Sequence, residues 1–153
     1  MPQYSFTTTW SFNAALEPVW EAIRHTRQWP EWWRGVERVV ELEPGGEDGL
    51  GSLHRSTWKS ALPYRLTFDS RVIRVERHRL FEIAATGELE GRGVWSFSSA
   101  GPTTNVRYDW TVFNNKRWMR TLAPLARPLF RWNHDVIMRW GQEGLARKLG
   151  RVS

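Results

Sequence analysis

Apolar and polar residues alternate along much of the first 114 residues, which is the pattern of half-buried β-strands. Turn signals rich in Gly and Pro separate the alternating segments, at spacings typical of a continuous antiparallel meander. We therefore predict seven strands, at residues 3–13, 36–42, 50–59, 64–75, 80–87, 93–99 and 104–114.

The alternation also assigns the two faces of the predicted sheet, because successive side chains of a strand point to opposite sides. One face is polar, and the other is apolar and rich in rings, with Tyr4, Phe6, Trp10, Phe12, Tyr64, Leu66, Phe68, Phe81, Ile83, Ala85, Trp95, Phe97, Val106, Tyr108, Trp110 and Val112. Residues 50–59 alternate poorly. Either His54 and Trp58 or Leu53 and Arg55 of this strand point to the apolar side.

Two short helical segments are predicted between the first two strands. Residues 16–23 place Pro18 in a first helical turn and three apolar side chains on one face. Residues 29–35 predict one or two further turns, which end at a glycine.

The longest helical pattern lies at the end of the chain, over residues 118–149. Pro124 and Pro128 each remove a backbone donor and disfavour helix at the preceding residue. We therefore expect a short segment at 117–126 and a main helix that begins near Pro128. Its apolar arc, which is expected to cover the apolar face of the sheet, contains positions 129, 132, 133, 136, 137, 140 and 144.

The aromatic content is high for a chain of 153 residues, with 11 Trp, 7 Phe and 3 Tyr. Each ring brings roughly 150–250 Å² of surface to be buried, and a core of this size does not require so many. We predict that some of the rings line an internal space. The length fits one domain over residues 1–153.

The net charge of +6 is concentrated at the end of the chain. Residues 116–153 carry nine Lys and Arg against two acids, and the remainder is close to neutral. A basic face of this kind attracts membrane phosphates, nucleic acid or an acidic ligand. The plainer interpretation is a solvated helix face.

Several kinds of site are not predicted. The chain has no cysteine, which excludes disulfides and thiolate chemistry. Its four histidines are scattered without a metal-ligand spacing, and no phosphate-binding loop or dinucleotide fingerprint is present. We expect neither a metal nor a cofactor.

Several stretches of sequence carry a family resemblance, at residues 12–20, at 29–33, at 93–97 together with 104–110, and at 131–141. With the order strand, two short helices, six strands and long helix, they resemble the START-related, Bet v 1-like (SRPBCC) superfamily, in particular its bacterial polyketide cyclase/dehydrase and lipid-transport branch. The resemblance implies a helix-grip fold of the α+β class, in which a curved antiparallel sheet wraps the C-terminal helix around a cavity. Folds of this kind serve many functions.

The expected site is that cavity, an apolar space with a few polar groups. Its expected ligand-binding residues are Trp33, Tyr64, Phe68, Phe81, Trp95, Tyr108, Trp110, Leu129, Asn133, His134, Val136, Ile137 and Trp140. Two of the polar residues also have structural interpretations. In the structural interpretation, His134 is a core histidine that is hydrogen-bonded to a backbone carbonyl. Asn133 is then an amide that ties the helix to a neighbouring strand.

The first function hypothesis is a binder or carrier of a hydrophobic small molecule, such as a lipid, a quinone or a polyketide-like aromatic. The second is a cyclase/aromatase or dehydratase, in which the cavity orients a reactive chain and acid/base groups move protons. His134, Tyr108 and His54 are its candidate catalytic residues. Asp109 fits poorly because it lies on the predicted polar face.

Other partners are considered from the basic segment at residues 116–132, which contains rings and apolar residues but no acid. One interpretation is an entrance lid that contacts anionic membrane lipid. A homodimer formed through this segment or the helix is a further hypothesis. Nucleic acid is not favoured, since most rings point inward. The first residues lack the features of a signal peptide, and we expect a cytoplasmic protein.

Overall fold

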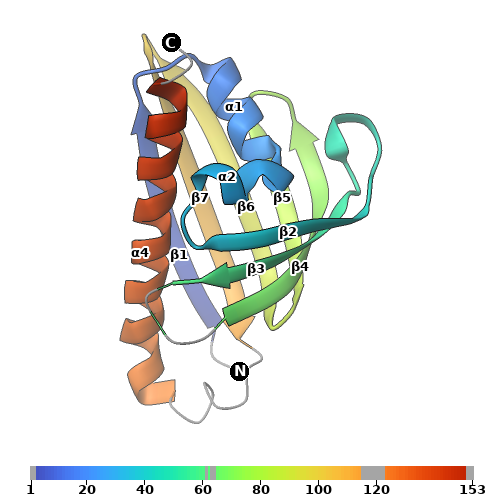
Figure 1. The fold of residues 1–153 in the computed structure, drawn as a ribbon, viewed down its shortest axis with the longest axis vertical. Helices are drawn as coiled ribbons and strands as arrows, with labels where there is room; N and C mark the ends of the chain where they lie inside the picture. Colours follow the sequence, from blue (N-terminus) through green and yellow to red (C-terminus); the bar gives the residue numbers. More distant parts are fainter. Residues whose placement is uncertain (1–2, 61, 63–64, 115–122, 151–153) are drawn as a thin grey trace.

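The computed structural model describes residues 3–60, 62, 65–114 and 123–150, with the backbone alone at 114 and 123–127. Its seven strands form one antiparallel sheet in the order β1-β7-β6-β5-β4-β3-β2 (Figure 1). The strands are β1 (Gln3–Phe12), β2 (Val36–Glu43), β3 (Leu53–Lys59), β4 (Arg65–Glu76), β5 (Leu80–Gly87), β6 (Leu89–Ala100) and β7 (Thr103–Asn114). The predicted meander is confirmed, and the first strand extends the sheet by pairing with the last, so that β1 and β2 are its two edge strands.

The helices lie between β1 and β2, in the turn before β3 and at the end of the chain. They are α1 (Leu16–Arg24), the 3-10 turn η1 (Thr26–Gln28), α2 (Trp29–Trp32), the 3-10 turn η2 (Glu47–Gly49) and the long α4 (Ala123–Gly150). Figure 1 shows the sheet curving around α4, with α1 and α2 at one end of the concave side. This arrangement is the helix-grip fold predicted from the sequence.

The predicted faces of the strands are also found. On β1, for example, Tyr4, Trp10 and Phe12 are buried, whereas the residues between them are exposed or partly exposed. Strand β6 begins four residues before the predicted Gly93. Glycines at 91 and 93 weaken the apolar pattern there, although both positions pair with β7.

The orientation of β3, which the sequence left open, follows from its contacts. His54, Ser56 and Trp58 face the concave side, and Arg55 and Thr57 face the other. Two of the three inward positions are therefore polar, which explains why alternation of hydropathy failed to assign this strand.

Helix α4 starts earlier than expected. It begins at Ala123 and continues through Pro128, so the prediction of a main helix near Pro128 was wrong by five residues. Pro124 is the second residue of the helix, where the missing N–H has no helical partner. Pro128 is the sixth residue, and the helix continues there without one backbone hydrogen bond.

The face of α4 that contacts the sheet is rotated from the predicted arc, although Asn133, Val136 and Gly144 of that arc are buried. Leu129 and Trp132 of that arc are 41% and 49% exposed. Phe130, Met138 and Leu145, which lie outside it, are buried. The buried side also includes Gly141, which lies outside the predicted arc because a glycine contributes little to a hydropathy pattern.

Many of the rings form a core cluster where α2 and α4 meet the sheet. Its indoles have centroid distances of 4.8–6.4 Å to one another and belong to Trp10, Trp29, Trp32, Trp33, Trp58 and Trp95. Much of the aromatic surplus thus packs against itself. Four of these indoles also border an internal space.

No helix within the described ranges combines the length and the apolar character needed to span a membrane.

Candidate ligand-binding cavity

A cavity of about 130 Å³ lies between the concave face of the sheet and α4. Side chains from all seven strands, from η1 and α2, and from residues 130–138 of α4 line it. The walls are mostly apolar, with a few hydrogen-bonding groups, as in small-molecule sites generally.

Most of the residues predicted for the site reach this cavity. The lining residues among them are Trp33, His54, Phe68, Phe81, Trp95, Tyr108, Trp110, Asn133, His134 and Ile137. Tyr64 lies outside the described residues.

Three predicted residues do not line the cavity because of the rotation of α4. Leu129 is exposed, and Val136 is buried elsewhere. The ring of Trp140 lies under the guanidinium of Arg34, with 4.3 Å between Cζ and the ring centroid. The structure thus places these three side chains outside the cavity.

Several lining residues were not predicted. Tyr4 and Phe6 belong to the predicted apolar face of the first strand, so the sequence contained the signal for them. Phe130 and Met138 were missed because the helix face was assigned one residue away. Thr26, in the 3-10 turn before α2, had no signal in the hydropathy pattern.

His134 is a lining residue whose ring nitrogens are both buried. Its imidazole stacks on Phe6, with ring centroids 4.4 Å apart and planes at 15°. Neither ring nitrogen has a hydrogen-bond partner among the described residues, and the nearest carboxyl oxygen, on Asp135, is 3.9 Å from Nδ1. The backbone carbonyl expected for a purely structural histidine is thus not found there.

Burial lowers the pKa of His134 to about 4, and the nearby Asp135 carboxylate only partly opposes this effect. The ring is therefore neutral at pH 7 and has one N–H donor and one nitrogen acceptor. A hydroxyl or carbonyl of a guest in the cavity could bond to it.

Asn133 both lines the cavity and ties α4 to the end of β3. The Ser60 hydroxyl donates a hydrogen bond to Asn133 Oδ1, and the Leu62 backbone N–H donates to Ser60 Oγ at 3.2 Å. This contact is the structural role considered from the sequence. It holds the helix against the strand that forms one cavity wall.

Tyr108 of β7 lies on the concave face of the sheet, in the wall of the cavity. Its ring stacks on Trp95 at 4.1 Å and on Trp110 at 5.8 Å between centroids. Gly93 makes this position possible, since a Cβ there would be 2.6 Å from Tyr108 Oη. Burial raises the pKa of the Tyr108 phenol well above its ordinary value, so the phenol stays protonated and can donate a hydrogen bond.

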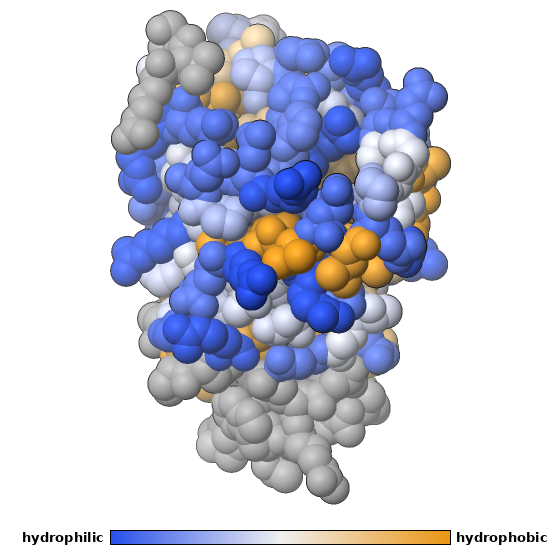
Figure 2. All heavy atoms as spheres, turned by 45° about the vertical axis from the view of Figure 1, so that its right-hand side comes forward, coloured by the Kyte–Doolittle hydropathy of each residue, from blue (hydrophilic) through white to orange (hydrophobic). Residues whose placement is uncertain are grey.

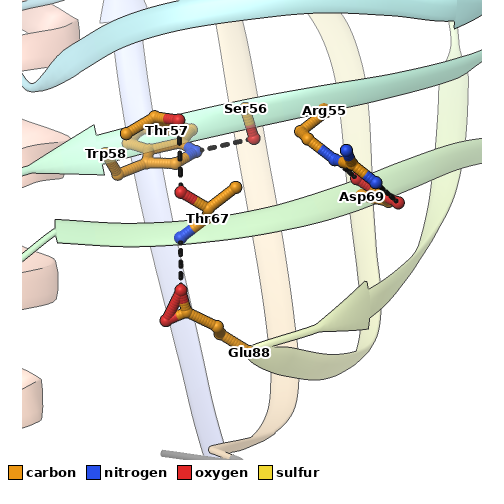
Figure 3. A network of polar contacts seen from close by, with 7 residues as sticks. All are labelled: Arg55, Ser56, Thr57, Trp58, Thr67, Asp69 and Glu88. Carbon is orange, nitrogen blue, oxygen red and sulfur yellow. Dashed lines mark hydrogen bonds and ion pairs between the residues drawn. The ribbon is translucent and has the colours of Figure 1, made fainter.

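A second group of polar residues lines the cavity on β3 and β4. His54 and Ser70 are direct cross-strand neighbours, and Ser56 accepts a hydrogen bond of 3.0 Å from Trp58 Nε1 (Figure 3). Burial lowers the pKa of His54, and the Glu41 carboxylate, 3.6 Å from Nε2, opposes this effect.

Contacts on the opposite side of the same two strands hold them in register. Arg55 pairs with Asp69 at 2.8 Å, and the hydroxyls of Thr57 and Thr67 are 3.2 Å apart (Figure 3). The Thr67 backbone N–H donates to a carboxylate oxygen of Glu88 at 3.3 Å. These contacts keep the inward residues of β3 opposite those of β4.

The polar groups of the cavity are therefore gathered at two places. His54 lies six residues, about 20 Å of extended strand, from Ser60, whose hydroxyl contacts Asn133. Aromatic and aliphatic side chains line most of the remaining wall, which also contains Ser56 and the phenol of Tyr108. In the described part of the chain, no three His, Asp or Glu side chains come together as a metal-ligand set.

Residues 3–152 match the model of a protein family described as polyketide cyclase / dehydrase and lipid transport. The chain belongs to this family. The resemblance predicted from the sequence is thereby confirmed at the level of the family and of the START/Bet v 1-like superfamily. No curated protein matches the sequence.

Solved structures share the fold at low sequence identity. Zhui aromatase/cyclase from Streptomyces sp. R1128 has a TM-score of 0.81 and 15% identity, over 98% of this chain and 95% of that one. A START superfamily protein from Mycobacterium smegmatis has a TM-score of 0.79 and 14% identity, over 97% and 99%. The di-domain ARO/CYC BexL from the BE-7585A biosynthetic pathway has a TM-score of 0.76 and 20% identity, over 96% of this chain. The chain spans 50% of the length of BexL.

Proposed function

We propose that the chain, as one ligand-binding domain over residues 1–153, binds a small hydrophobic molecule in the cavity between its sheet and α4. One observation carries the proposal: a ring-walled cavity of about 130 Å³ contains a neutral histidine with no hydrogen-bond partner among the described residues. Membership of a family described by cyclase and lipid-transport activities supports it.

The size of the cavity limits its guest. An apolar cavity of about 150 Å³ in another protein binds benzene, so this space suits one aromatic ring or a short alkyl segment. A whole lipid, quinone or polyketide is larger. We infer that a ligand of these classes places one ring or one chain segment in the cavity, unless α4 moves.

A second candidate function is a cyclase/aromatase or dehydratase. The observation that favours it is that a neutral imidazole, His134, and a protonated phenol, Tyr108, line the same cavity. Such a pair can act as a general base and a general acid. Zhui and BexL, whose structures have this fold, are described as aromatase/cyclase and ARO/CYC.

The proposal is tested with benzene, titrated into the full chain and followed by two-dimensional protein NMR. We expect saturable shifts of residues around the cavity. Ile83→Phe places a ring in the cavity and should weaken benzene binding at least tenfold. Ile73→Phe is the matched control, because Ile73 is 40% exposed and does not line the cavity. No saturable shifts in the wild type, or equal binding by both variants, would overturn the proposal.

A further inference from the structure

A second pocket, of about 510 Å³, adjoins the cavity at the end where His54 lies. The two spaces share four lining residues, Thr26, His54, Val72 and Phe81, and so meet at these side chains. We call the first space the inner cavity and the second the outer pocket. The outer pocket is the larger of the two, at about 510 Å³ against about 130 Å³.

The walls of the outer pocket differ in chemistry from those of the inner cavity. One part comes from the end of α1, from η1 and α2, from β2 and from the turn before β3, and includes Arg24, His25, Arg27, Gln28, Glu31, Glu41 and Asp48. The other part comes from β3, β4 and β5, where Val72, Val75 and Phe81 make the wall apolar beside His54. Figure 2 shows the side of the molecule that carries β2, η2 and β4, where hydrophilic residues surround a smaller apolar patch. A ligand that enters from this side passes a polar space before it reaches the rings.

Both signs of charge are present in the outer pocket, and several charges are already engaged. Arg27 Nη1 is 3.8 Å from Glu41 Oε2, and Arg24 Nη1 donates to the Asp48 carbonyl oxygen at 2.5 Å. Two arginines against three acids leave little net charge. A strongly charged ligand group would therefore meet a repelling residue as well as an attracting one.

Neutral hydroxyl groups suit such a wall better than charges do. Each hydroxyl is both a donor and an acceptor, so it can donate to a carboxylate and accept from a guanidinium or an amide. Glu31 and Gln28 are exposed and next to the engaged Arg27, which places free acceptors and donors side by side. Several hydroxyls on one ligand group could be satisfied together.

We propose that the ligand of this protein is amphipathic, with an apolar ring in the inner cavity and a neutral, hydroxyl-rich group in the outer pocket. The atoms that join the two parts lie beside His54. This inference rests on the proposed function for the ring, and extends it by assigning the outer pocket and the chemistry of the second half of the ligand.

The junction supports a ligand that is continuous through both spaces. His54 is polar but only 13% exposed, and its Nε2 is 3.6 Å from Glu41 Oε1, beyond ordinary hydrogen-bond distance. Ser70, its cross-strand neighbour, adds a hydroxyl on the inner side. An ether or glycosidic oxygen at this point would meet hydrogen-bonding groups, whereas Val72 and Phe81 contact the adjoining ring.

The test compares ligands that carry the ring, the hydroxyls or both, by NMR titration of the full chain. Benzene represents the ring and methyl β-D-glucopyranoside the hydroxyls. Phenyl β-D-glucopyranoside, phenyl β-D-galactopyranoside and 3-phenoxy-1,2-propanediol carry both. We expect at least one of these three two-part ligands to bind at least tenfold more tightly than benzene. Methyl β-D-glucopyranoside should bind more weakly than the best of the three.

Variants of outer-pocket residues test whether the affinity that a two-part ligand gains over benzene comes from the outer pocket. Arg27→Ala and Glu31→Ala should each lower the affinity of the best phenyl ligand by about three- to tenfold and leave benzene binding unchanged, because both residues lie only in the outer pocket. Arg38→Ala and Glu47→Ala are the matched controls, since both side chains are exposed and neither lines a pocket described above. We expect no change in these two.

The failures of the two proposals can be told apart. If benzene fails to bind, the proposed function is wrong. If benzene binds but none of the three two-part ligands binds more tightly, the inference about the outer pocket is overturned. Equal binding of methyl glucoside and the best phenyl ligand, or an equal effect of the control variants, would overturn it as well.

Discussion

The indole Nε1 of Trp33 donates a hydrogen bond of 2.9 Å to the main-chain carbonyl oxygen of Ile137. The bond joins the residue that follows α2 to the middle of α4, and both residues line the inner cavity. It therefore fixes the distance between the short helix and the long one at the edge of the ligand space.

Trp33→Phe should test the contribution of this bond. The variant keeps a ring but loses the donor and part of the packing at a fully buried site, so we expect a loss of about 2 kcal/mol in the free energy of unfolding. Urea denaturation measures it. Trp132→Phe, at an exposed position, should change stability by less than about 0.5 kcal/mol. A similar loss in both variants would contradict the role given to the bond.

Gly141 is expected to tolerate no side chain. A Cβ there would lie 2.5 Å from Trp33 Cε2 and 2.8 Å from Trp10 Cζ2. Gly141→Ala should therefore destabilise the protein by about 1–3 kcal/mol, although alanine favours helix. Gly150→Ala, where a Cβ would meet nothing within 4 Å, should be neutral or slightly stabilising. Thermal or urea unfolding of the two variants separates crowding from helix propensity.

The stability of the protein should depend on pH through His134. Its pKa in the folded protein is about 4, below the ordinary value of 6.5. Between these two pH values the unfolded chain binds a proton that the folded His134 does not, so the free energy of unfolding falls as the pH falls, and levels off below about pH 4. The full contribution is about 3 kcal/mol.

His134→Phe removes this contribution. Urea denaturation at several pH values should show a shallower decrease in stability between pH 6.5 and 4 for the variant than for the wild type. Titratable groups that both proteins contain, such as His54, contribute equally to the two pH dependences, so their contributions cancel in the comparison. Parallel curves would show that His134 takes up its proton equally well in the folded state.

The same histidine should select ligands that carry a hydroxyl. Toluene and p-cresol differ by one phenolic group, and a hydrogen bond to the neutral imidazole should favour p-cresol by up to about tenfold. The preference should disappear in His134→Phe, as measured by NMR titration. If the preference survives there and disappears in Tyr108→Phe, the phenol bonds to Tyr108 instead.

Membrane contact through residues 116–132 remains a proposal, and residues 115–122 lie outside the described part of the chain. In the described portion, Leu129, Arg131 and Trp132 are exposed on α4, and this mixture suits an interface with anionic lipid. We expect co-sedimentation with vesicles that contain phosphatidylserine and less with neutral vesicles. Trp132→Ala should reduce it severalfold. Equal binding to both kinds of vesicle would refute the contact.

The strands and their inward faces could be predicted because alternation is a local property of the sequence. Tyr4 and Trp110, for example, point inward as their strand patterns indicate. Strand β3 shows where this signal fails, since the cavity has polar groups on its wall and His54 and Ser56 point inward with Trp58.

The orientation of α4 could not be predicted from hydropathy because it depends on close packing. Gly141 and Gly144 face α2, and a Cβ on Gly144 would overlap the carbonyl oxygen of Trp32. The helix turns these small residues toward its neighbour, and the apolar Leu129 and Trp132 are left exposed. The outer pocket was missed for a related reason, since its polar residues come from segments that are far apart in the sequence.

The glycine contact between α2 and α4 has a mechanical consequence. Where backbone and indole touch without intervening side chains, the C-terminal half of the long helix can neither slide nor roll without a clash. Its first turns, from Ala123 to Asn133, have no such contact with α2 in the described structure, and Pro128 weakens their hydrogen bonding. A guest larger than one ring is nevertheless expected to extend toward the outer pocket, because an outward tilt of these first turns would first have to break the contact between Ser60 and Asn133.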